Sequence, residues 1–165
     1  DGLDGLCGGC SLFDFATMAL ICVAMATANP ESASNLLNTG IFAGAMVGAL
    51  MGFLRYNSHP ARVFMCDVGS FFIGGALVGI TTVTRNSLLL PIIALAMFMS
   101  SLSDIIQIGW FKITKKKYGA GRRIFKMAPL HHHFELSGMP ETKVVAMYYL
   151  ATVALCLLAL LGFVA

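Results

Sequence analysis

The apolar segments of this chain are too long and too frequent for a water-soluble protein. Of its 165 residues, 58% are hydrophobic and only 12% are charged, and the mean hydropathy is +0.81. A soluble domain has about a quarter of its residues charged. The composition therefore excludes a soluble globular domain, a disordered chain and a coiled coil, and it predicts a protein embedded in lipid.

Five apolar segments are separated by polar or helix-breaking residues. A helix needs about 20 apolar residues to cross the hydrocarbon core of a bilayer, so the chain has room for about five spans and for no large soluble domain. We expect one all-α integral membrane domain. Because the chain opens at Asp1 without an initiator Met or a signal peptide, we expect it to be part of a longer protein. The expected spans are 12–28, 39–54, 68–84, 88–111 and 144–165.

The second of these spans carries glycines at four-residue spacing from Gly40 to Gly52. This spacing places them on one face of a helix. Small residues let two membrane helices approach closely, so the pattern favours helix packing over a ligand-lining role.

The basic residues predict how the chain is oriented, because Lys and Arg are retained on the cytoplasmic side of short loops. Ten of the eleven basic residues fall in two loops, 55–67 and 112–143, which the order of the spans places on the same side. We therefore assign both loops and the opening segment 1–6 to the cytoplasm. Arg85 and the loop 29–38 are left on the opposite side.

Acidic residues and histidines gather on this same side, and Asp67 opens the third span. An Asp at this position can cap the helix by accepting backbone N–H bonds. It can equally be a magnesium ligand, since Mg²⁺ prefers oxygen and commonly bridges carboxylates to substrate phosphates. Local sequence supports both interpretations equally.

His131, His132 and His133 are consecutive in the second cytoplasmic loop. Three successive residues cannot face one point on a helix, and on an extended segment only the first and third share a side. A zinc site built from these three alone is therefore disfavoured. Their near-neutral pKa suits contact with phosphate or proton transfer, whereas the alternative is a polar loop at the membrane surface.

Three motifs resemble one known family. The segment Phe111–Leu136 (FKITKKKYGAGRRIFKMAPLHHHFEL) resembles the signature loop of the phospho-N-acetylmuramoyl-pentapeptide transferases, bacterial membrane enzymes of peptidoglycan synthesis. Asp1–Leu6 (DGLDGL) resembles the family's NLTDGLDGL segment, and Phe64–Ser70 (FMCDVGS) resembles its FMGDxGS segment. A match of this length is far more specific than a short pattern. The resemblance covers essentially the whole chain and implies the C-terminal half of such a transferase.

The resemblance implies a reaction and its partners. Undecaprenyl phosphate in the bilayer attacks UDP-N-acetylmuramoyl-pentapeptide, giving lipid I and UMP, with Mg²⁺ required. The implied location is the bacterial cytoplasmic membrane with the active site facing the cytoplasm, and a homodimer is expected, with no nucleic acid as partner. Because the family's upstream helices are absent, we expect the isolated chain not to turn over.

The resemblance also implies roles for individual residues. Asp67 matches the family's catalytic and magnesium-binding aspartate, and His131, His132 and His133 match its triple histidine, which we expect to be catalytic. The positions that match substrate-binding residues are Asp1, Asp4, Asn57, Phe64 and Gln107.

The chain departs from the family pattern at Cys66, where glycine is usual, at Ser100, where glutamate is common, and at Met139, where tryptophan is usual. Three alternatives stay open. One is a related polyprenyl-phosphate sugar-1-phosphate transferase that uses another nucleotide sugar, and another is a noncatalytic membrane remnant. The third is an ion transporter, with Asp14 and Asp104 as candidates for the ion pathway.

Overall fold

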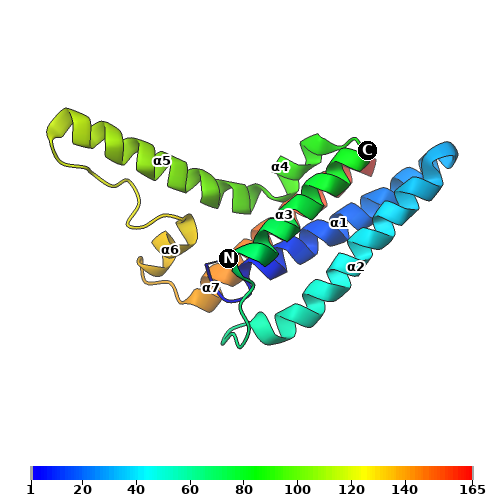
Figure 1. Ribbon diagram of the computed structural model, residues 1–165, viewed down its shortest axis with the longest axis horizontal. Helices are drawn as coiled ribbons and strands as arrows, with labels where there is room; N and C mark the ends of the chain where they lie inside the picture. Colours follow the sequence, from blue (N-terminus) through cyan, green and yellow to red (C-terminus); the bar gives the residue numbers. More distant parts are fainter. Residues whose placement is uncertain (1, 165) are drawn as a thin grey trace.

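The computed structural model describes residues 2–164, and this part of the chain is helical and contains no strand (Figure 1). The expected all-α fold is confirmed. The long helices are α1 (Leu6–Ala28), α2 (Ala33–Asn57), α3 (Cys66–Val83), α5 (Leu95–Tyr118) and α7 (Glu141–Val164). Short helical elements connect them: η1 (Pro30–Ser32), η2 (Ser87–Leu89), α4 (Leu90–Ile93) and α6 (Leu130–Glu135).

Four stretches are long and apolar enough to cross a membrane: α1, η1 with α2, α3, and α7. The expected span 88–111 differs from a single straight helix. It is broken at Ala94, which has φ −88° and ψ 14°, and the segments Ser87–Ile93 and Leu95–Tyr118 meet at 79°. If this bent pair counts as one span, the described residues contain five, as the composition predicted.

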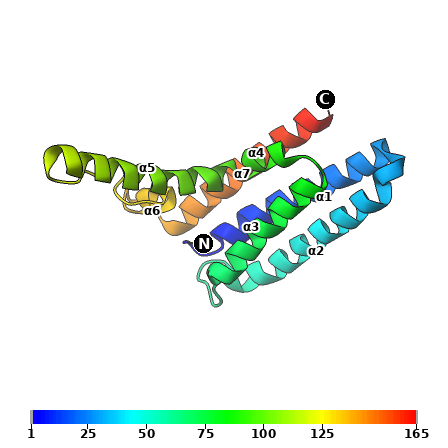
Figure 2. The ribbon, with the colours of Figure 1, turned by 45° about the horizontal axis from the view of Figure 1, so that its top comes forward.

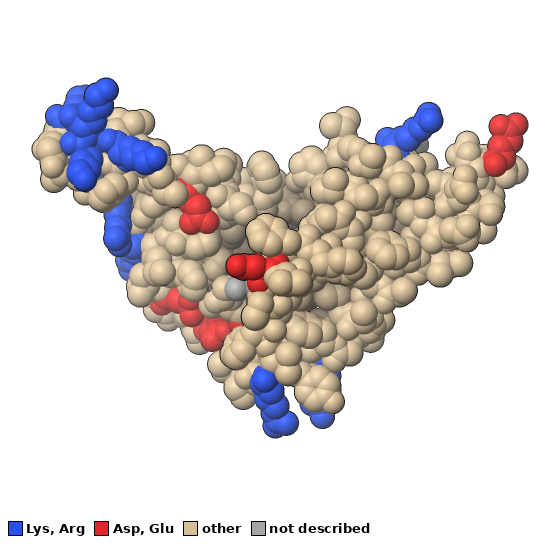
Figure 3. Space-filling view, in the orientation of Figure 1, with Lys and Arg blue, Asp and Glu red and all other residues tan. Residues whose placement is uncertain are grey.

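Helix α5 leaves the bundle formed by α1, α2, α3 and α7, and the chain returns to the bundle through α6 (Figures 1 and 2). The far end of α5 carries Lys115, Lys116 and Lys117 in its last turn, where positive charge interacts favourably with the helix dipole. Gly119 then ends the helix with φ 74°, a conformation that glycine adopts without strain. Figure 3 shows this end of the molecule as a cluster of basic side chains.

Helix α1 forms the centre of the bundle because it is apolar around most of its circumference. Phe15, Met18 and Ile21 are fully buried against the neighbouring helices. The glycine face of α2 makes fewer close contacts with other helices than its spacing predicts. A Cβ atom on Gly40 would lie 3.2 Å from the Cβ of Cys22, but Cβ atoms on Gly44, Gly48 and Gly52 would meet nothing within 4 Å in the described chain.

Candidate functional site

The segment before α1 is held by residues from distant parts of the chain. The backbone N–H of Asp4 donates to Oε1 of Glu141, at the start of α7, over 2.7 Å. The N–H of Gly5 donates to Oδ1 of Asn57 over 3.1 Å, and the hydroxyl of Tyr149 donates to the Gly5 carbonyl over 2.7 Å. Gly5 has φ 78°, so the turn into α1 requires the conformational freedom of glycine.

The Asp4 carboxylate lies in a cluster with His59 and Glu141, which we call the Asp4–His59–Glu141 cluster. Oδ2 of Asp4 accepts a hydrogen bond from the N–H of Ala61 over 2.9 Å and lies 3.2 Å from Nδ1 of His59. The same Nδ1 is 3.5 Å from Oε2 of Glu141. One ligand atom from each of the three residues lies within 4.8 Å of the others, so the cluster has the spacing of a metal site.

Asn57 connects the DGLDGL segment to the loop that carries Phe64 and leads into α3, where Asp67 lies. Its side chain is 1% exposed, accepts from Gly5, and donates to the Val63 carbonyl over 2.9 Å. Phe64 is 67% exposed, so its ring is available for a ligand or another part of the protein. The structure therefore brings Asp4 and Asn57 together and places Phe64 on the surface of the adjoining loop.

Asp67 lies exposed in the first turn of α3. No side chain caps this helix, so the capping interpretation of Asp67 has no supporting hydrogen bond. Among the described residues, its carboxylate has no hydrogen-bond or ion-pair partner; only its backbone carbonyl accepts, from the Ser70 hydroxyl. An uncommitted carboxylate beside a glycine-rich helix end has the oxygen chemistry that Mg²⁺ requires.

The three histidines point toward different partners, as expected for consecutive residues. His131 is 6% exposed, and neither of its ring nitrogens has a hydrogen-bond partner among the described residues. Nδ1 of His132 lies 2.7 Å from Oε2 of Glu135, and Nδ1 of His133 accepts from the N–H of Lys126 over 3.1 Å. No zinc site is formed by the three imidazoles in this part of the structure.

Burial, together with the neighbouring His132, lowers the pKa of His131 to about 4. The ring is therefore neutral at pH 7. It packs edge-on against His132 and Tyr148, with ring centroids 4.4 and 6.4 Å away. A Cβ atom on Gly2 would collide with this ring, so the DGLDGL segment passes directly over His131. His131 therefore brings the signature loop, 111–136, into contact with the DGLDGL segment.

Gln107 does not join this group through its polar atoms. Its Oε1 accepts from the N–H groups of Ile124 and Phe125 over 3.0 and 3.1 Å, and its Nε2 donates to the Phe125 carbonyl over 2.9 Å. It thus holds the returning loop against α5. Gln107 also lines a cavity of about 520 Å³, together with Asp104 and the two cations Lys112 and Arg123.

Two remaining expectations concern residues elsewhere. Asp1 lies outside the described residues. Asp14, one of the ion-pathway candidates, is 2% exposed inside α1 and accepts a weak hydrogen bond from the Cys156 thiol, with 3.7 Å between Oδ1 and Sγ. Asp14 also lines a cavity of about 510 Å³ between α1, α3 and the beginning of α5.

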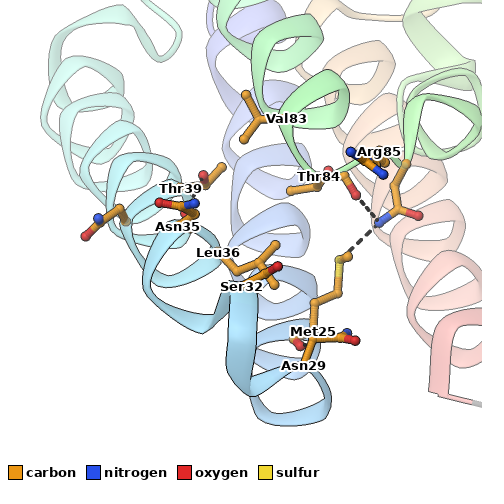
Figure 4. Close-up of a pocket in the computed structure, with 11 residues that line it drawn as sticks. Met25, Asn29, Ser32, Asn35, Leu36, Thr39, Val83, Thr84 and Arg85 are labelled. Carbon is orange, nitrogen blue, oxygen red and sulfur yellow. Dashed lines mark hydrogen bonds between the residues drawn. The ribbon is translucent and has the colours of Figure 1, made fainter.

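A second, larger cavity of about 800 Å³ lies at the other end of the bundle, between the α1–α2 connection and the end of α3 (Figure 4). Its polar lining consists of amides, hydroxyls and one cation, Arg85. The amide of Asn86 is occupied by the Met25 sulfur and the Thr84 carbonyl. No carboxylate is among the lining residues, so this cavity lacks the groups for magnesium-dependent phosphate chemistry.

Sequence reasoning missed the roles of His59, Glu141 and Tyr149 in holding the start of α1. The available signals were the position of Glu141 directly after Pro140, at a helix start, and the location of His59 between Asn57 and the FMCDVGS motif. Neither signal specifies Asp4 as the partner, which is 55 positions from His59 and 137 positions from Glu141.

Comparison with known proteins agrees with the three sequence motifs. A model of glycosyl transferase family 4 matches residues 1–85. The phospho-N-acetylmuramoyl-pentapeptide-transferase of Amoebophilus asiaticus (strain 5a2) is 42% identical over 166 aligned positions, which cover 97% of this chain and 41% of that protein. The resemblance is confirmed, and the chain spans about two fifths of the length of the curated relative it matches.

Proposed function

The chain belongs to glycosyl transferase family 4, and from this premise we propose that it is part of a phospho-N-acetylmuramoyl-pentapeptide transferase. The reaction transfers the phospho-sugar from its UDP conjugate to undecaprenyl phosphate and yields lipid I and UMP. One observation carries the proposal: Asn57 joins the DGLDGL segment to the loop that bears Phe64 and leads into Asp67 at the start of α3, at one end of a membrane bundle. A lipid acceptor and a water-soluble nucleotide sugar must meet at such an end.

Asp67 is the residue we assign to magnesium. Its exposed carboxylate is free of partners among the described residues, and its neighbours leave space on the outer side of α3, where Val68 is 83% exposed. When bound, Mg²⁺ supplies positive charge to the phosphate oxygens of the donor.

The other residues bind and orient the substrates. The exposed Phe64 ring offers a stacking surface for uracil, since every base has a π-face. We assign Asp4 to the nucleoside side of the site, where the buried Asn57 holds the surrounding segments in place. We assign His132 and His133 to the phosphates. An oxygen of undecaprenyl phosphate attacks the phosphorus next to the sugar, the bond to the UMP oxygen breaks, and UMP leaves. Catalysis is then mainly positioning and neutralisation of charge.

We place this end of the bundle in the cytoplasm of a bacterium, at the inner membrane. Ten of the eleven basic residues belong to the loops at this end, and positive charge is retained on the cytoplasmic side. A UDP-linked donor is a cytoplasmic metabolite class, which agrees with this orientation. A homodimer in the bilayer belongs to the same proposal.

The test is UMP release by the complete protein that contains this chain, supplied with undecaprenyl phosphate, UDP-N-acetylmuramoyl-pentapeptide and Mg²⁺. We expect release by the unaltered protein and by a Glu31→Gln control, which changes an exposed carboxylate in the connection between α1 and α2, at the other end of the bundle. Asp67→Asn should abolish release. No release from folded, unaltered protein would contradict the proposal and favour another nucleotide sugar.

Because the chain corresponds to 41% of its relative, we expect the isolated 165-residue polypeptide to release no UMP. Release by the isolated chain above that of its Asp67→Ala variant would contradict this expectation. Cys66→Gly in the complete protein tests the neighbouring departure from the family pattern. An active enzyme with either residue would show that the Cys66 thiol is tolerated beside Asp67.

A further inference from the structure

The Asp4–His59–Glu141 cluster joins three segments that are far apart in the sequence. Asp4 precedes α1, His59 lies in the loop between α2 and α3, and Glu141 begins α7. Of the three, only Asp4 has a role in the proposed chemistry. His59 and Glu141 therefore need a separate explanation.

The hydrogen bonds of Asp4 leave half of its carboxylate free. Oδ2 is committed to the N–H of Ala61 and to His59, whereas no partner of Oδ1 is found among the described residues. The Asp4 backbone is fixed independently by Glu141. Asp4 is thus held at its backbone N–H and at Oδ2, and Oδ1 is left to face a ligand. Such an arrangement preorganises a binding group.

Glu141 and His59 also fix the loop that leads to Phe64. Ala61, which donates to Asp4, is three residues before Phe64, and the N–H of Arg62 bonds back to the Tyr56 carbonyl over 2.8 Å. Moving Asp4 therefore moves the anchoring point of this loop. Glu141, at the start of α7, is in this way connected to the exposed ring of Phe64, more than 70 positions earlier in the chain.

We propose that Glu141 and His59 are positioning residues: they hold Asp4 and, through Ala61, the Phe64 loop in the geometry that binds the nucleotide. This inference rests on the proposed function. Neither residue is assigned a contact with substrate. Their effect is exerted through Asp4 and the loop.

The cluster is not needed to hold the helices together. Directly beneath it, Leu6, Val144 and Tyr148 form an apolar contact between α1 and α7 in which each is at most 5% exposed. The side chains of His59 and Glu141 are 46% and 27% exposed, and pairs at such positions contribute little to overall stability. Removing them should alter the loop while the bundle persists.

The experiment uses the complete protein and the variants Glu141→Ala and His59→Ala, with Glu31→Ala as the matched control at the other end of the bundle. Hydrogen exchange of the backbone amides in 58–65, binding of UMP, and the separate values of KM and kcat are measured. We expect exchange in 58–65 to be about tenfold faster, and UMP binding and KM to be about fivefold to tenfold poorer, as for loss of one hydrogen bond to a charged group. We expect kcat to change by less than about twofold.

Conservative replacement gives a second criterion. Glu141→Gln keeps an oxygen that can accept from the Asp4 N–H, so it should recover most of the UMP binding that Glu141→Ala loses. Equal losses of UMP binding in Glu141→Ala and Glu141→Gln would overturn the proposal, because the hydrogen bond to the Asp4 N–H would then not be what supports UMP binding. Glu31→Ala should match the unaltered protein in every readout.

The readouts separate this inference from the proposed function. Unchanged exchange in 58–65 in both variants would overturn the inference even if the protein is an active transferase. A lower kcat at constant KM would also overturn it, because the residues would then act in the chemical step. Loop protection that depends on added Mg²⁺ would overturn it as well, since the three groups would be metal ligands. Unaltered protein that neither binds nor releases UMP contradicts the proposed function, whereas faster exchange in the variants would still support the positioning of the loop.

Discussion

The hydroxyls of Ser100 in α5 and Tyr148 in α7 lie 2.5 Å apart and form a hydrogen bond between the two helices. Both residues are buried, at 6% and 5% exposure. The bond lies near the beginning of α5, before this helix diverges from the bundle (Figure 2). The short serine side chain thus brings its hydroxyl against that of Tyr148.

We predict that Tyr148→Phe lowers the free energy of unfolding by about 1 kcal/mol, because the Ser100 hydroxyl loses its buried partner. Ser100→Ala should have a similar effect. The double variant should lose less free energy of unfolding than the two single variants together, since either change alone already breaks the hydrogen bond. Unfolding of the complete protein in detergent measures all three, and strictly additive losses would contradict the prediction.

Gly9 should be far less tolerant of substitution than Gly44. A Cβ atom on Gly9 would collide with the ring and hydroxyl of Tyr149, whereas a Cβ on Gly44 meets nothing within 4 Å. Gly9→Ala should therefore destabilise the protein by about 1–3 kcal/mol through overpacking between α1 and α7. Gly44→Ala serves as the control and should be neutral, or stabilising by up to about 1 kcal/mol, because alanine favours helix. A reversed order in melting temperature would show that α2 has a close partner at Gly44.

Apolar patterning was sufficient to predict an all-α chain with four to five helices that are long and apolar enough to cross a bilayer, because length and hydrophobicity determine whether a helix can do so. It did not predict the bend at Ala94. The segment 88–111 is apolar on average although it contains Pro91 and the polar run SSLSD, and its hydropathy does not distinguish a straight span from two helices meeting at 79°. The glycine spacing predicts which residues of α2 share a face, but of these glycines only Gly40 closely approaches another helix in the described chain. A small residue permits close contact between helices without requiring it.

Residue type predicts the chemistry available to single side chains, and the roles assigned to the site residues stay predictions. A carboxylate at a helix start pointed to Asp67, and the spacing argument against a three-histidine metal site agrees with the separate partners of His131, His132 and His133. Pairing between distant residues was not predictable, as with Asp4 and Glu141, because a single sequence contains no information on which polar groups meet across 137 positions.

Gln107 should control the order of the returning loop. Gln107→Glu replaces the Nε2 donor with an acceptor that faces the Phe125 carbonyl, so two acceptors would oppose each other. We expect faster hydrogen exchange in 120–127, with α5 itself unchanged. Lys116→Gln, an exposed change farther along the same helix, is the control. Equal exchange in the two variants would mean that the loop is held by other contacts.

His131 should make the protein less stable under mild acid. Its folded-state pKa of about 4 lies below its ordinary value of 6.5, so the unfolded chain binds more protons than the folded chain between these two pH values. Stability should therefore fall as the pH is lowered from about 6.5 to about 4, and this residue should contribute no further loss below that range. His131→Phe keeps an aromatic ring against His132 and Tyr148 but cannot be protonated. Because carboxylates titrate in the same range, the informative quantity is the difference in melting temperature between pH 7 and pH 5. This difference should be smaller in His131→Phe than in the unaltered protein, and equal differences would mean that the buried ring is not the group that senses acid.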